Sequence, residues 1–134
     1  MTIKEAALLH SIIEKEIDAG YFPSDSKERL KSIIKEGVIN ASLEDLRLIF
    51  EIIEKGEKKY RKEYDKAKKT YEELKREYDK VSKELDERDK DTFMSADEIN
   101  MIGALTIRLV RALDSFNKIK TIYENYQAAS RIEL

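Results

Sequence analysis

A heptad repeat in the middle of the chain constrains the fold more than any other feature. From residue 43 to residue 88, apolar residues recur at alternating steps of three and four, and only Glu57 and Arg88 are charged. The members are Leu43, Leu46, Phe50, Ile53, Glu57, Tyr60, Tyr64, Ala67, Tyr71, Leu74, Tyr78, Val81, Leu85 and Arg88. This spacing keeps one seam of a helix against a partner helix. Such a helix would be about 70 Å long, which is too extended for a compact catalytic domain.

The composition narrows the class of protein. The chain has 134 residues, of which 40% are charged and 41% hydrophobic, and its formal net charge is −2, so no global charge attracts nucleic acid or membrane. It has no cysteine, no apolar stretch long enough to span a bilayer and no signal-peptide pattern at its start, so we expect a cytoplasmic protein. Lys and Glu are abundant and Gln occurs once, which fits either a thermophilic source or an AT-rich genome.

Start and stop signals predict four helices, since one Pro and four Gly leave little room for turns. The first helix should run from about Thr2 to Ala19 and end at Gly20. The second should follow a bend at residues 21–23, begin at Ser24 or Asp25 with a capping box to Glu28, and end at Gly37.

The third and fourth helices also carry capping signals. Ser42 with Asp45 should cap the heptad helix. Ser95 with Glu98 should form a capping box for a helix that continues to about Ser130, with Met94 and Ile99 placed for a hydrophobic staple.

The short connection between the third and fourth helices requires them to pack antiparallel. If the turn is centred near Thr92, facing residues of the two helices have numbers that add up to about 184. The expected pairs are Leu85 with Ile99, Val81 with Ile102, Leu74 with Leu109, Tyr71 with Leu113, Ala67 with Phe116, and Tyr60 with Tyr123. The fold class is therefore all-α: a long antiparallel helical hairpin (coiled coil) over residues 42–134, with two short helices of residues 1–41 packed at its base.

The fourth helix has a second apolar stripe beside its seam, formed by Leu105, Ala112, Ile119 and Tyr126. A narrow heptad seam on the third helix cannot cover both, and an exposed stripe of this length is a liability in a monomer. We therefore expect these four residues to mediate self-association, most simply as a homodimer.

A row of basic residues spaced seven apart lies opposite the heptad seam and includes Lys55, Lys62, Lys69 and Arg76. One interpretation is contact with a polyanion such as a nucleic-acid backbone. The interpretation we favour is a solvated face, because acids stand four residues before most of these bases and would form stabilising i, i+4 pairs. Net charge also alternates along the chain, with a basic middle and acidic ends. This pattern could attract a polyanion or orient assembly between copies, but the interpretation we favour is chance in a chain with so many charges.

No motif predicts chemistry. His10 with Glu14 could form a metal corner, but a lone His beside an apolar face is more often a packing residue. The tyrosines at 60, 64, 71 and 78 lie on the seam, which favours a core role over base stacking. We expect no enzyme activity, no catalytic residue, no cofactor and no metal.

Two functional hypotheses follow. The first is a structural or adaptor protein that associates with itself, and with another protein through the first helix or the acidic hairpin tip at residues 87–91. The alternative is a small nucleic-acid-binding protein, or a subunit of a nucleoprotein complex, that uses the basic middle of the rod.

Overall fold

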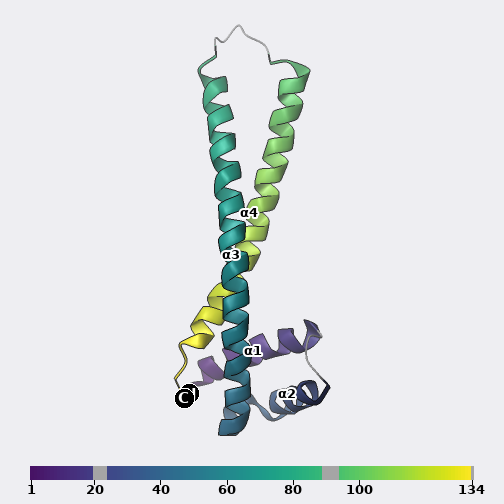
Figure 1. The fold of residues 1–134 in the computed structure, drawn as a ribbon, viewed down its shortest axis with the longest axis vertical. Helices are drawn as coiled ribbons and strands as arrows, with labels where there is room; N and C mark the ends of the chain where they lie inside the picture. Colours follow the sequence, from purple (N-terminus) through teal and green to yellow (C-terminus); the bar gives the residue numbers. More distant parts are fainter. Residues whose placement is uncertain (20–23, 89–93, 134) are drawn as a thin grey trace. The chain divides into compact units, whose positions relative to one another are not determined.

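The computed structural model describes residues 1–19, 24–88 and 94–133, and these residues are almost entirely helical (Figure 1). The elements are α1 (Ile3–Ala19), α2 (Ser24–Glu36), the short 3₁₀ helix η1 (Val38–Asn40), α3 (Leu43–Asp86) and α4 (Ala96–Ser130). Each predicted helix is present within about two residues of its expected bounds, the uncertainty usual for helix ends. The expected cap at Gly20, the bend at residues 21–23 and the turn centre at Thr92 lie outside the described residues.

Side-chain caps begin three of the helices. The Thr2 hydroxyl accepts from the Glu5 backbone N–H, and the Glu5 carboxylate accepts from the Thr2 N–H, so α1 starts with a reciprocal capping box. The backbone N–H of Asp45 donates to the Ser42 hydroxyl at 3.2 Å, as predicted for α3. These bonds satisfy backbone donors that have no partner inside the helix.

The capping box predicted for α4 also forms. The backbone N–H of Glu98 donates to the Ser95 hydroxyl at 3.2 Å, and that hydroxyl donates to the Glu98 carboxylate. The Arg88 guanidinium forms an ion pair with the same carboxylate. The hydrogen bond from Arg88 within this pair holds the pKa of Glu98 below its usual value. Glu98 thus serves both the start of α4 and the pairing of the two helices near the end of the hairpin.

Gly37 ends α2 as predicted, with a φ of 96° that side-chain-bearing residues rarely adopt. The 3₁₀ turn that follows, η1, was not predicted. Val38 within it is buried, and the Asn40 side chain donates to the Glu36 carbonyl at the end of α2. The connection between α2 and α3 is therefore an ordered part of the core.

The chain divides into two compact units. The N-terminal unit is Met1–Tyr60 with Ile122–Leu134, and the hairpin unit is Arg61–Thr121. This division differs from the predicted boundary at residue 42, because the start of α3 and the end of α4 pack with the first two helices. Ile49 and Ile53 of α3 and Ala129 of α4 are as completely buried as Leu9 of α1.

The N-terminal unit holds most of the buried apolar core. Its core residues are Ala6, Leu9, Ile12, Ile13, Ile17, Leu30, Ile33, Val38, Ile49, Ile53, Tyr126 and Ala129. Glu57 is a buried charged residue in this unit, and its carboxylate accepts a hydrogen bond from the Tyr123 hydroxyl at 3.5 Å. This contact explains how the heptad seam accommodates one of its two charged members.

The heptad seam of α3 faces the protein interior as predicted. Its members from Leu46 to Leu85 are buried or half-buried, whereas Leu43 and Arg88 at its two ends are exposed. In the hairpin unit the Phe116 ring lies 5.4 Å from that of Tyr64 and 5.8 Å from that of Tyr71. These tyrosines lie about one turn on either side of Ala67, so Phe116 is level with Ala67 and the predicted register is confirmed.

Two predicted seam pairs are wrong in detail. Leu113 was expected to meet Tyr71, but Leu113 is 38% exposed and Tyr71 stacks on Phe116 instead. Ile99 was expected to meet Leu85, but it is 53% exposed. The axial register is correct, whereas the rotation of α4 about its own axis differs, so these two side chains point away from α3. The fold class is nevertheless the predicted one, an antiparallel helical hairpin with two short N-terminal helices.

Gly56 and Gly103 provide a matched test of packing in the two units. A methyl group at Gly56 would overlap the ring of Tyr126, whereas one at Gly103 would meet nothing within 4 Å. We expect Gly56→Ala to lower the free energy of unfolding by about 1–3 kcal/mol, because overpacking outweighs the better helix propensity of Ala.

The control is Gly103→Ala, which should raise helix stability by about 0.5–1 kcal/mol. Urea denaturation followed by circular dichroism measures both changes. A stabilised Gly56→Ala protein would show that Tyr126 does not pack against α3 at this position.

Candidate functional site

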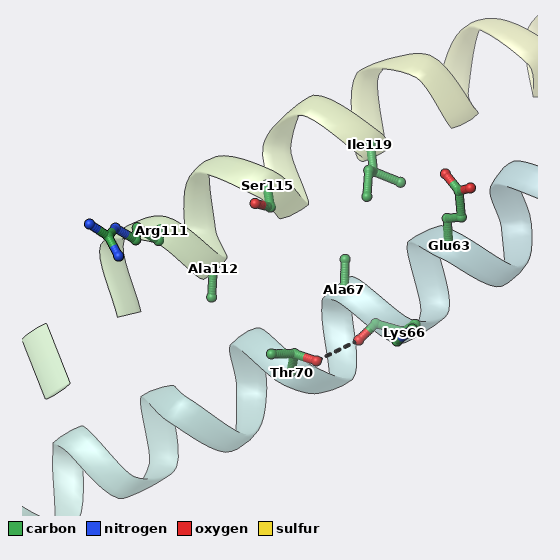
Figure 2. A pocket seen from close by; sticks show the side chains of 8 residues that line it. All are labelled: Glu63, Lys66, Ala67, Thr70, Arg111, Ala112, Ser115 and Ile119. Carbon is green, nitrogen blue, oxygen red and sulfur yellow. Dashed lines mark hydrogen bonds between the residues drawn. The ribbon is translucent and has the colours of Figure 1, made fainter. Parts of the chain in front are cut away.

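A groove in the hairpin unit includes three residues that the sequence analysis discussed, Ala67, Ala112 and Ile119. Its volume is about 350 Å³, and it is lined by Glu63, Lys66, Ala67, Thr70, Arg111, Ala112, Ser115 and Ile119. Figure 2 shows Ala67 and Ala112 directed into the space between α3 and α4, with Ile119 reaching in from α4. The groove exists because small side chains face each other across the two helices and leave the space between them unfilled.

The groove combines an apolar lining with several polar side chains. The Thr70 hydroxyl donates to the Lys66 backbone carbonyl at 3.0 Å, so it is already engaged within α3. Glu63, Lys66 and Arg111 lie at the rim, while the walls are mainly apolar.

The residues predicted for self-association do not form one exposed stripe. Leu105 and Tyr126 are only 5% and 4% exposed, so they are covered by their own chain. Tyr126 packs against Gly56 and Tyr60 in the N-terminal unit, with the two tyrosine ring centres 5.0 Å apart. Ala112 and Ile119 are half-buried and line the groove. The expectation of an uncovered stripe is therefore wrong, because this side of α4 faces the packed part of each unit.

A different face of α4 is mostly exposed and mostly apolar; Thr106 within it is polar and half-buried. We call it the outer row and define it as Ala96, Ile99, Gly103, Thr106, Val110 and Leu113. Within it Ile99 is 53% exposed and Val110 is 60% exposed, and Ile107 beside it is 53% exposed. The outer row follows alternating steps of three and four in the sequence. Gly103 and Thr106 interrupt its hydrophobic pattern, so the pattern alone did not identify this row.

The basic row lies on the solvent side of α3. Lys55, Lys62, Lys69 and Arg76 are all exposed. Among the described residues, none of the four lies within 4 Å of a carboxylate. Elsewhere on α3, Lys58 lies 3.5 Å from Glu54 in an i, i+4 pair. The predicted solvated face is present, but the ion pairs predicted within it are not formed.

A small polar contact anchors Tyr126 in the N-terminal unit. Its hydroxyl donates a hydrogen bond to the Glu16 carboxylate of α1. Burial and this neighbouring carboxylate raise the pKa of Tyr126 well above its usual value of 10.0. A hollow of about 120 Å³ lies beside the pair, and its lining includes Ser11, Lys15 and Asn125.

Other candidate features are limited within the described part of the chain. His10 lies 3.2 Å from Glu14, as the sequence suggested, but residues 1–19, 24–88 and 94–133 contain no group of three side chains placed to hold a metal ion. None of the described helices combines the length and apolar character needed to cross a bilayer.

Comparisons with known proteins give no assignment. No protein-family description, curated protein or solved structure matches this chain. The candidate sites therefore rest on the geometry of the groove, the outer row and the basic row.

The Tyr126–Glu16 contact predicts a loss of stability in alkaline solution. Because the pKa of Tyr126 is raised in the folded state, its contribution is complete below pH 10 and is lost as the pH rises above the ordinary tyrosine value. We expect the wild-type protein to lose more unfolding free energy between pH 9 and pH 11 than a Tyr126→Phe variant.

Urea denaturation at a series of pH values measures this difference, with Tyr78→Phe in the hairpin unit as the control. Parallel pH profiles for wild type and Tyr126→Phe would contradict the assigned contact.

Proposed function

We propose that the protein is a non-enzymatic helical structural or adaptor protein that acts through protein–protein contacts made by its hairpin. The observation that carries this proposal is the outer row of α4, where Ile99 and Val110 are each more than half exposed. A soluble protein that keeps large apolar side chains on one face of a helix usually uses that face for association.

The thin core of the hairpin unit supports the same conclusion. Among its described residues, Leu105 is the only one that is buried, with 5% of its surface exposed. Two helices that cover only one narrow face of each other gain little from burial, so contact with a further protein surface would add to their stability.

Val110→Asp tests the proposal directly. It places a carboxylate in the outer row, and burying that charge in an interface costs several kcal/mol. We expect the dissociation constant of any complex formed through this face to rise by at least about 100-fold, which corresponds to roughly 2.7 kcal/mol. Sedimentation equilibrium of the pure protein measures self-association, and titration calorimetry measures binding of a partner identified by mass spectrometry.

Ser115→Asp is the matched control, because it adds the same charge to an exposed groove position on the same helix. Binding that survives Ser115→Asp and is lost in Val110→Asp supports the outer row. The reverse result would move the contact to the groove. A wild-type chain that neither self-associates nor binds a protein through either face would contradict the proposal.

A second candidate function is binding to a polyanion through the basic row. The observation that favours it is that Lys55, Lys62, Lys69 and Arg76 are exposed and form no ion pair among the described residues. Such lysines are available to phosphates, and their seven-residue spacing puts them on one side of α3.

A double reversal, Lys62→Glu with Lys69→Glu, separates the two candidates. If the row is only a solvated face, the variant should associate and unfold as the wild type does, within about 0.5 kcal/mol. If the row holds nucleic acid, gel-shift titrations should show binding that the reversal abolishes, with the salt dependence falling by about 0.9 per lost phosphate contact. We expect the first outcome, and submicromolar wild-type binding at physiological salt would contradict it.

A further inference from the structure

We propose that the outer row of α4 pairs with the outer row of a second copy of this chain, with the two α4 helices antiparallel. This inference rests on the proposed function and deepens it by naming the partner and the register. It assigns the interface to Ile99, Gly103, Thr106, Val110 and Leu113, and not to the residues predicted from the sequence.

The spacing of the row sets the register. Residues 96, 99, 103, 106, 110 and 113 follow steps of three and four, the pattern of a and d positions in a coiled coil. In an antiparallel pair each a position meets a d position of the partner. Centring the pair between residues 104 and 105 places Ile99 opposite Val110 of the second copy, Gly103 opposite Thr106, and Ala96 opposite Leu113. A single two-fold axis between the copies therefore pairs every residue of the row with another residue of the row.

The centre of the row is built for close approach. Gly103 has nothing within 4 Å of the position that a Cβ would take, so its own chain does not require a glycine there. A glycine inside a helix costs roughly 0.5–1 kcal/mol relative to Ala. The Thr106 hydroxyl donates to the Ile102 backbone carbonyl at 2.8 Å, so its polar group is satisfied within α4 and its methyl group is free to be buried.

The flanks of the row favour the same geometry. Ile102 and Leu109 lie on the flank toward α3 and are half-buried, so the apolar surface continues from the hairpin seam to the row. The other flank carries three exposed polar residues and one exposed apolar residue, namely Asn100, Asp114, Lys118 and Ile107. When two rows pair, both α3 helices lie on the side of Ile102 and Leu109, as in a four-helix bundle. The opposite flanks, which are mainly polar, then lie at the outside of the pair.

Charge distribution selects the antiparallel arrangement over the parallel one. The acidic end of the hairpin, taken as the described ranges 84–88 and 94–98, holds five acidic residues and one basic residue. The basic segment, taken as 61–70 and 108–121, holds nine basic residues and three acidic ones. Antiparallel pairing brings the acidic end of each copy alongside the basic segment of the other, for example Glu98 level with Arg111. Parallel pairing would place like charges together.

Single cysteines test this register, because the natural chain has none. Ile99→Cys and Val110→Cys proteins of different tagged mass are mixed and oxidised with copper phenanthroline. We expect a disulfide-linked heterodimer, because the two positions face each other in one layer. Each variant alone should remain uncrosslinked, since equivalent positions would be about 16 Å apart along the helix.

Ser115→Cys mixed with Ile99→Cys is the control, because Ser115 lies on the groove side of α4. A disulfide in Ile99→Cys alone would indicate parallel pairing and overturn the proposal. Sedimentation of the cysteine-free protein separates the remaining outcomes. A dimer without the mixed disulfide overturns this register, and a monomer at 100-micromolar concentration overturns the homodimer. In both cases a partner whose binding is lost in Val110→Asp would leave the proposed function standing.

Discussion

The structure depends on the contact between the heptad seam of α3 and the side of α4 that carries Phe116. The ring of Phe116 lies between those of Tyr64 and Tyr71, and this cluster fixes how far the two helices are shifted along each other. A seam of this kind is narrow, because two helices can cover only one stripe of each other. As a consequence, Leu105 is the only buried residue among those described in the hairpin unit. The apolar surface that the seam does not cover is the outer row of α4.

In the N-terminal unit, additional helices cover the apolar surface that two helices alone would leave exposed. There α1, α2 and η1 surround the start of α3 and the end of α4, so that Ile49, Ile53 and Ala129 become fully buried. Close packing also admits residues that a two-helix seam would not hold. Gly56 lets the Tyr126 ring approach α3, and Glu57 is buried with a hydrogen bond from Tyr123. The first part of α3 thus contributes to a well-packed core, whereas the rest of α3 packs against α4 along a narrow heptad seam.

Much of this fold could be predicted from the sequence because local signals determined it. The heptad spacing gave the buried side of α3, and the caps at Ser42 and Ser95 gave the starts of two helices. The orientation of α4 could not be read in the same way, since this helix carries apolar residues on more than one face and its pattern does not show which face is covered. Because of that ambiguity the sequence predicts an uncovered Leu105 and Tyr126 and a covered Ile99, whereas the structure shows the opposite for all three. The groove was missed for a similar reason, because small residues such as Ala67 and Ala112 signal either tight packing or an unfilled space.

The thin seam also links association to stability. A partner that binds only the folded hairpin stabilises it in proportion to the logarithm of its concentration relative to the dissociation constant. The hairpin has one buried residue among those described, so a partner that covered more of its apolar surface would add to the stability that its own core supplies. Gly103 is informative in this light, because it lowers the helix propensity of α4 without any packing requirement inside its own chain. Gly103 thus weakens the isolated helix while it leaves room for the close approach of another helix, and the proposed pairing of two outer rows uses both properties.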